Sequence, residues 1–270
     1  MKTENLFGLA ALCFFILALS ACSDDETPSV HPFTVDVASC EVPLRRSSEI
    51  PIASGNGRYA LEIGNPVLAE ATVVFADAAD IDGKVRIIGK QKGETSLAVT
   101  DSVTRETVTI AVRVIDNYLA TRVTRSNHPA LADNVWMYLA DNDTHDCYFF
   151  GGSADEATAM PVGYPLAQGK YMFSVKAGIP YLTLTYPSDA DGKFAGAGAA
   201  PVSHTFDISG SDKQVPAILK SHLRVDWEEL SKGTRTSVPS SYYLKMKETG
   251  TAFETEALLS LTPPPEGFLN

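Results

Sequence analysis

The chain has 270 residues, of which 20% are charged, and a formal net charge of −11. An acidic chain without a block of basic residues argues against nucleic acid and against anionic lipid headgroups as partners. The length predicts one or two domains, each large enough to bury a core.

The first 21 residues predict a signal peptide. Residues 6–21, LFGLAALCFFILALSA, form an uncharged and mostly apolar run after the early Lys2. The run falls short of the ~20 apolar residues that a transmembrane helix needs, and it fits the apolar core of a signal peptide. We therefore expect residues 1–21 to be removed by cleavage.

The residues around Cys22 resemble the lipobox of bacterial lipoproteins. Leu19, Ser20 and Ala21 place one large apolar residue and two small ones directly before the thiol. The resemblance implies that Cys22 becomes the first mature residue and carries acyl chains such as palmitate. Two or more chains make a lipid anchor stable. The alternative is an ordinary cleavage site beside which a cysteine stands by chance.

An acidic run follows this lipidation site. Ser23, Asp24, Asp25 and Glu26 resemble the export signal that sends Bacteroidota-type lipoproteins to the outer face of the outer membrane. The alternative is a solvated start to a linker. We expect residues 22–32 to form a lipidated acidic linker, and the protein to be lipid-anchored in the outer membrane and exposed on the cell surface.

Two cysteines remain for the folded part of the chain, Cys40 and Cys147. The oxidising cell envelope permits a disulfide between them. Such a bond would have to join the two domains predicted below, so two buried free thiols are favoured.

Residues 33–115 predict a β-sandwich of short alternating strands. The strictest apolar alternation runs through Val108, Ile110, Val112 and Val114. The stretches GNGRYALEIGNPVLAEATV and IDGKVRIIGKQKGETSLAVTD resemble the bacterial Ig-like domains of surface proteins. That family implies a spacer or adhesive module and assigns no ligand. The strands are expected at residues 34–37, 48–53, 59–63, 72–75, 85–87, 97–99 and 108–114.

The composition changes beyond residue 115, and residues 118–262 predict a second β-sandwich-like domain, so the whole chain is expected to be all-β. Nine of the ten tyrosines and both tryptophans lie beyond residue 115. The domain boundary is placed at residues 116–118. The strands are expected at residues 135–139, 147–150, 170–175, 181–186, 203–208, 219–227 and 242–246.

The second domain also carries a resemblance of its own. The stretches VWMYLADNDTHDCYFF, LAQGKYMFSV and LKSHLRVDW resemble the sandwich of fimbrillin-type lipoproteins. The glycine- and alanine-rich residues 194–201 predict a loop. Residues 263–270, which begin with three prolines, predict an extended tail.

The sequence carries no catalytic motif, which predicts a protein that is not an enzyme and binds no cofactor. No G-x-S-x-G nucleophile elbow occurs, and Gly196-Ala197-Gly198 lacks the lysine of a phosphate-binding loop. Glu228 and Glu229 are adjacent, so this pair cannot flank one glycosidic bond as glycosidase carboxylates do. An enzyme is the least favoured of the three functions considered.

No metal site is predicted either. The acidic run at residues 141–146 has Asp146 where a calcium loop needs glycine, so it is interpreted as a solvated hairpin turn. The five histidines never stand at metal-ligand spacing and are interpreted as surface or strand residues: His31, His128, His145, His204 and His222.

The aromatic residues of the second domain are the remaining functional signal. In the strand at residues 135–139, Trp136 and Tyr138 share one face. If exposed, they would form a platform for a sugar ring or a flat protein surface; burial on both sides of the strand is the alternative. Secondary candidates for ligand binding are Tyr164, Tyr242 and Tyr243.

These observations predict a non-enzymatic cell-surface lipoprotein whose second domain binds a glycan or a surface protein. The alternative is a fimbrillin-like structural or pilus-accessory protein.

Replacing Cys22 by alanine should abolish acyl labelling and leave the precursor uncut, because no sulfur remains to accept the lipid. Labelling with palmitate and the mobility of the protein on a denaturing gel measure both effects. Cys13→Ala, within the signal peptide, should leave them unchanged. Membrane retention of Cys22→Ala at the wild-type level would contradict the anchor.

Overall fold

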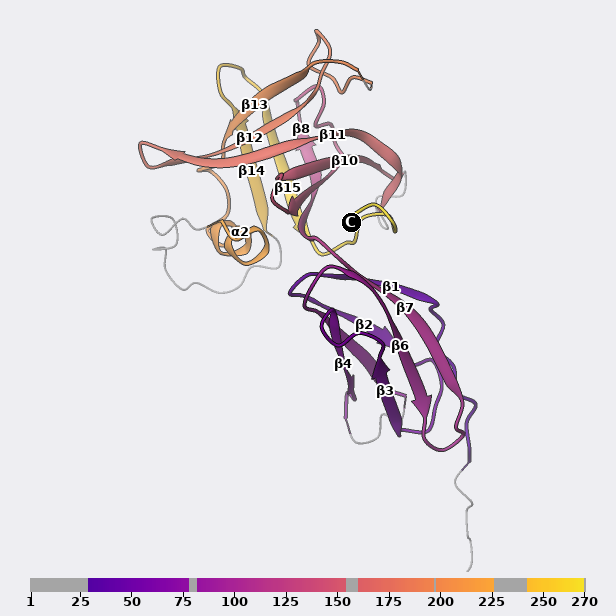
Figure 1. The fold of residues 1–270 in the computed structure, drawn as a ribbon. Coiled ribbons are helices and arrows are strands. Elements are labelled where there is room, and N and C mark those ends of the chain that lie inside the picture. Colours follow the sequence, from indigo (N-terminus) through magenta and orange to yellow (C-terminus); the bar gives the residue numbers. More distant parts are fainter. Residues whose placement is uncertain (1–28, 78–81, 154–159, 197, 226–241, 270) are drawn as a thin grey trace, which may run out of the picture.

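The computed structural model describes residues 29–77, 82–153, 160–196, 198–225 and 242–269 (Figure 1). The predicted signal peptide, the lipidation site Cys22 and the export signal at residues 23–26 lie outside the described residues. Glu228 and Glu229 lie outside them as well.

The first domain packs two sheets around one core. The four-stranded sheet has the order β1 (Ser39–Pro43), β7 (Thr107–Ile115), β6 (Gly93–Asp101) and β3 (Tyr59–Ile63). The three-stranded sheet has the order β2 (Ser47–Pro51), β5 (Lys84–Gly89) and β4 (Ala69–Val74). β1 runs parallel to β7, whereas the other pairs in these two sheets are antiparallel. The predicted all-β class is confirmed.

The alternation read from the sequence places the core of this domain. Ile110, Val112 and Val114 of β7 are all buried, and they pack in one cluster with Val85 and Ile87 of β5 from the other sheet. Successive side chains of a strand point to opposite faces, so one face of each strand supplies the core.

The predicted strand at residues 34–37 is wrong. Thr34 forms only an isolated bridge with Ser54, and the first strand begins at Ser39. Residues 39–43 become the strand because they pair along the edge of β7, from Ser39 opposite Ala111 to Pro43 opposite Ile115.

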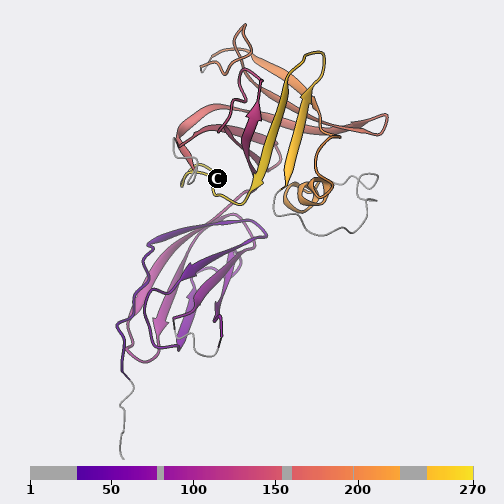
Figure 2. The same ribbon diagram turned by 180° about the vertical axis from the view of Figure 1, so that it is seen from behind.

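The second domain is a closed eight-stranded barrel instead of the predicted second sandwich (Figures 1 and 2). β15 pairs with β8, so the last strand joins the first and no second sheet is formed. Neither strand was predicted from the sequence. In chain order the strands are β8 (Asn117–Ser126), β9 (Trp136–Asp141), β10 (Asp146–Gly152), β11 (Pro161–Lys176), β12 (Ile179–Pro187), β13 (Pro201–Asp207), β14 (Tyr243–Glu248) and β15 (Glu254–Ser260).

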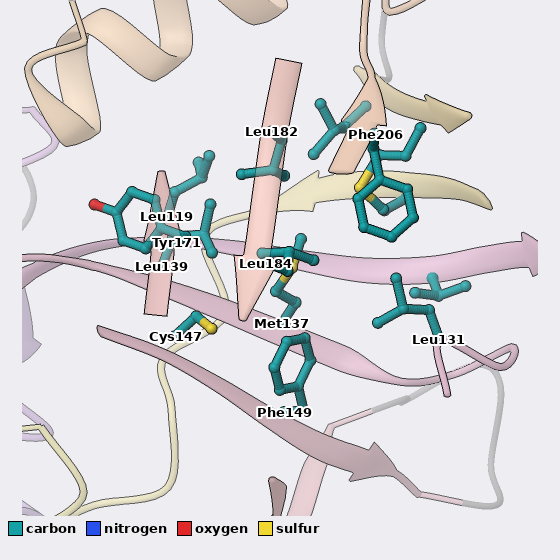
Figure 3. Close-up of a cluster of buried hydrophobic side chains, with 14 of the residues drawn as sticks. Leu119, Leu131, Met137, Leu139, Cys147, Phe149, Tyr171, Leu182, Leu184 and Phe206 are labelled. Atoms are coloured by element: carbon teal, nitrogen blue, oxygen red, sulfur yellow. The ribbon is translucent and has the colours of Figure 1, made fainter. Parts of the chain in front are cut away.

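The barrel interior is filled by side chains from most of its strands (Figure 3). Leu182 and Leu184 of β12, Met137 of β9 and Phe149 of β10 are fully buried in this cluster. The hydroxyl of Tyr171 is satisfied there by the carbonyl oxygen of Ala140, at 2.9 Å. The interior is therefore a packed core.

The two cysteines of the folded part are free thiols in different domains. Cys147 is buried in the barrel core, and burial raises the pKa of its thiol well above its usual range. Cys40 lies on β1 and is half-buried, and burial raises its pKa as well. Both thiols are therefore protonated at neutral pH.

Residues 215–223 form a helix, α2 (Val215–Leu223), so the strand predicted at residues 219–227 is wrong over its described part, residues 219–225. A proline stands in the first turn, where its fixed backbone angle favours a helix. Val215, Leu219 and Leu223 recur every four residues, which buries one face of the helix against the barrel. In the described part of the chain, no helix has the length and apolar character needed to span a bilayer.

The last residues tie the two domains together. Only Asp116 separates β7 from β8, and the C-terminal tail, whose described residues are 263–269, returns to this junction (Figure 2). The backbone N–H of Gly267 donates to Glu41 Oε1 at 2.9 Å, and Arg113 Nη2 donates to the carbonyl oxygen of Leu269 at 3.0 Å. The ring of Phe268 packs against Phe150 at 4.9 Å. The tail thus contacts β1 and β7 on one side and the barrel on the other.

Gly169 of β11 allows the barrel strands to pack closely. A Cβ at this position would lie 2.1 Å from the carbonyl oxygen of Thr185 on β12. Gly169→Ala should lower the free energy of unfolding by about 3 kcal/mol, because backbone has to move to relieve the clash. Urea denaturation measures the change. The control Gly196→Ala, whose Cβ would meet nothing within 4 Å, should change stability little, and an equal loss in both variants would contradict the argument.

Candidate functional site

The platform predicted for Trp136 and Tyr138 is buried. The two residues are 3% and 0% exposed, and their rings stack at 6.2 Å. The Tyr138 hydroxyl donates to the carbonyl oxygen of Pro263 at 3.1 Å, and Phe268 packs against the same cluster. An exposed platform is therefore wrong: the C-terminal tail covers the outer face of β9.

The three secondary candidates are more accessible but are not brought together as one site. Tyr164 on β11 is 93% exposed. Tyr243 begins β14 and is half-buried, and its N–H donates to Asp212 Oδ2 at 2.9 Å. Tyr242 precedes β14, is half-buried and lines a cavity. Of the predicted residues, Tyr242 is thus the one that contributes to the groove described next.

A groove runs along the junction of the two domains. Its polar half is a cavity of about 460 Å³ between the β1–β2 segment of the first domain and β8, α2 and the tail of the second. Its apolar half, of about 320 Å³, is lined by Leu119, Ile218, Tyr242, Leu258 and Leu259. The two halves share His222, Ser260 and Leu261, and we call them together the interdomain groove.

Arg46 sets the electrostatics of the polar half. It follows the left-handed turn at Arg45, which has a φ of 63°. The Arg46 Nη2 atom is enclosed and has no hydrogen-bond partner among the described residues. Burial lowers the pKa of Arg46, and the nearby Tyr118 opposes that shift. This side chain is therefore a cation with unused hydrogen-bonding capacity at the groove.

His222 and Tyr118 flank the guanidinium as neutral groups. Burial and the charge of Arg46 both lower the pKa of His222, so its ring is neutral at pH 7. Its Nδ1 lies 3.0 Å from the carbonyl oxygen of Ile218, which makes that nitrogen the donor. Burial raises the pKa of Tyr118 to about 12, so its hydroxyl stays protonated at neutral pH. It can therefore donate a hydrogen bond to a ligand.

The carboxylates at this end of the groove are already paired. Glu41 accepts hydrogen bonds from Arg113 and from the N–H of Gly267. Glu49 forms an ion pair with Arg86 at 2.7 Å. The groove therefore offers one cationic end that the described carboxylates do not neutralise by direct contact, and one apolar end.

The barrel also brings together two histidines that sequence spacing kept apart. Nitrogen atoms of His128 and His204 and a carboxylate oxygen of Glu248 lie within 4.8 Å of one another. His204 Nδ1 is 2.7 Å from Glu248 Oε1, and Thr251 donates to the other carboxylate oxygen at 3.0 Å. The pairing of β13 with β14 creates this cluster, and no motif in the sequence signals it.

The tautomer of His128 favours hydrogen bonding over metal binding in this cluster. Its Nδ1 accepts the backbone N–H groups of Ala130 and Leu131, at 3.1 and 3.2 Å. In the neutral ring the hydrogen is then on Nε2, which lies 3.9 Å from Glu248 Oε2. A metal ion on Nε2 would require the opposite tautomer, with Nδ1 as a donor. We interpret the cluster as a set of polar contacts that holds β13 and β14 together.

The family comparison concerns the first domain. The family described as "Pilus formation protein N terminal region" matches residues 40–115. This range coincides with the segment from β1 to β7, and it is the segment that resembles bacterial Ig-like domains in sequence. Among curated proteins no significant match is found.

The search of solved structures returns S-layer proteins at a low level of similarity. The S-layer protein rSbsC(31–844) covers 68% of this chain at 13% identity with a TM-score of 0.28. Domains 5–6 of the S-layer protein SbsC cover 65% at 14% identity, also with a TM-score of 0.28. The chain spans 24% of the first of these and 96% of the second. A TM-score this low carries no argument about fold or function.

The histidine cluster predicts a pH-dependent stability. Burial lowers the pKa of His128 to about 4, below its ordinary value of 6.5, so the folded state favours the neutral ring. The contribution of neutral His128 to the free energy of unfolding is fully present above pH 6.5. It is lost as the pH falls towards 4, which lowers the free energy of unfolding by up to about 3 kcal/mol. Urea denaturation between pH 7 and 4 measures this loss.

The matched comparison uses His128→Asn, whose side-chain oxygen can still accept the two backbone N–H groups. This variant should lose less stability between pH 7 and 4 than the wild type. His31→Asn, at an exposed position, should behave as the wild type does. Identical pH profiles for all three proteins would show that His128 does not titrate as stated.

Proposed function

We propose that the protein is a cell-surface structural or pilus-accessory protein, held at the outer membrane by lipid on Cys22. One observation carries the proposal: the pilus-formation family matches residues 40–115, the whole strand region of the first domain. The lipobox and the acidic run after it support the location.

The way the domains are joined supports a structural role. A single residue, Asp116, connects β7 to β8, and Leu44 N–H donates to the carbonyl oxygen of Ile115 at 2.9 Å beside this connection. Arg45 and Lys92 of the first domain form ion pairs with Asp141 and Asp116. A short connection with contacts on several sides limits the relative motion of the domains. The first domain is therefore suited to hold the barrel in a fixed orientation.

The barrel has an apolar surface on which a neighbouring subunit could dock. Met160, Val162, Tyr164 and Leu166 are 46%, 47%, 93% and 48% exposed, and we call them the β11 strip. Residues 162, 164 and 166 lie in the exposed first part of β11, where Gly163 has a φ of 70° and the pairing with β10 is irregular. Pro165 has no backbone N–H, so this part of the strand lacks a donor for pairing with another strand. Contact through the side chains is therefore expected, as at other exposed apolar patches.

Binding to a glycan or another surface partner is the second candidate function. The observation that favours it is the 93% exposure of the Tyr164 ring within the β11 strip, since exposed aromatic rings stack on sugars and on flat protein surfaces. This role would use the second domain but not the buried pair Trp136 and Tyr138.

The β11 strip provides the test of the proposed function. In the native host, the double variant Val162→Lys, Leu166→Lys should reduce the amount of this protein in sheared surface fibres at least fivefold, because two charges disrupt the apolar contact. The control Met172→Lys, 58% exposed on the same strand but outside the strip, should not. Quantitative immunoblots of the fibre and membrane fractions measure the effect.

Two results would contradict the structural role. One is the absence of the wild-type protein from the fibre fraction together with normal fibres in its deletion strain. The other is an equal amount of the double variant and the wild type in the fibres. Intact fibres with reduced attachment of the double variant to glycan-coated surfaces would favour the second candidate.

A further inference from the structure

The interdomain groove has the size and the two-part lining of a binding site for a small amphiphile. Its halves measure about 460 and 320 Å³ and share lining residues, which is within the range of ordinary ligand pockets. One half is lined by polar groups of both domains, and the other by leucine side chains of the barrel and by Ile218 of α2.

Arg46 differs from the other arginines of this junction. Arg45 forms an ion pair with Asp141, and Arg113 forms one with Glu41. Arg46 has no such partner among the described residues, and its Nη2 is enclosed without a hydrogen bond. A half-buried guanidinium without a counterion is unfavourable, and a carboxylate bound in the groove would supply the charge and accept hydrogen bonds from the part of Arg46 that lines it.

The charge around Arg46 selects for a single negative charge. Glu41 and Glu49 also line the polar half, each held by its own arginine. A doubly charged phosphate would be repelled by these carboxylates, whereas a carboxylate carries one charge and matches the planar guanidinium. The protonated hydroxyl of Tyr118 provides a further donor at this end.

The apolar half needs an apolar occupant. Leu119 from β8 and Leu258 from β15 line it, and Leu261 at the rim is 81% exposed. Covering these side chains with a hydrocarbon chain removes apolar surface from water. A sugar would leave its hydroxyl groups unpaired against leucine.

We propose that the interdomain groove binds a small monocarboxylate with an apolar chain, of the fatty-acid type. Arg46 binds the carboxylate, Tyr118 donates a second hydrogen bond to it, and the chain lies over Leu258 and Leu261. This site is separate from the β11 strip, so the inference goes beyond the proposed structural function and stands or falls independently of it.

Isothermal titration of the full mature chain with decanoate tests the site. Decanoate should bind at least tenfold more tightly than decanol, which has the same chain without the charge, and decyltrimethylammonium should not compete. Arg46→Gln should weaken decanoate binding at least tenfold. Arg45→Gln, which removes the same charge one residue away and outside the groove, should change it less than twofold.

A second variant tests the rim that the two halves of the groove share. Leu261→Asp changes an exposed side chain and places a negative charge at the rim, so it should weaken decanoate binding at least tenfold. Thermal unfolding of each variant confirms that the chain is folded. No binding of decanoate at millimolar concentration, equal binding of decanol, or undiminished binding by Arg46→Gln would each overturn the proposal.

Discussion

The pairing of β15 with β8 is the constraint on which the second domain depends. It joins segments that are far apart in sequence: Ser126 and Thr255, 129 positions apart, lie opposite one another and share a hydrogen bond of 2.8 Å. Closing a sheet in this way removes its free edges, which an open sheet of the same strands would expose. The closure also places α2 against β8 and delivers the end of β15 to the first domain. The apolar half of the interdomain groove has walls from β8 and β15, so it exists only because these strands meet.

The C-terminal tail adds contacts between the closed barrel and the first domain. Three prolines at its start limit the backbone to extended conformations and remove N–H groups that would otherwise need partners. Beyond them, Phe268 fills the aromatic cluster on β9 and β10, while Gly267 and Leu269 bond to Glu41 and Arg113. This segment has no regular secondary structure, and it is held in place because several of its backbone groups and its ring find partners.

The sequence predicted the all-β class and many of the strands. The structure explains why the other elements were missed or wrongly assigned. Strict alternation identified β7, because one face is buried and the other is not. β8 has both faces largely buried, so its apolar residues carry no period and it was missed. α2 was taken for a strand although Val215, Leu219 and Leu223 have helical spacing. Trp136 and Tyr138 were correctly seen to share a face, but that the tail covers them depends on contacts more than 120 residues apart. The groove and the histidine cluster likewise arise from closure of the barrel, which no local pattern encodes.

The parallel pairing of β1 with β7 has a mechanical consequence. The chain enters β1 from the N-terminal side and leaves β7 towards the barrel, so a pull between the N-terminal end and the barrel acts along the two strands in opposite directions. In this shearing geometry the hydrogen bonds between the strands share the load and have to break together, whereas an unzipping geometry would load them one at a time. The ion pair of Arg113 with Glu41 spans the same pair of strands and adds to the resistance. This arrangement would resist lengthening of the first domain under such a pull.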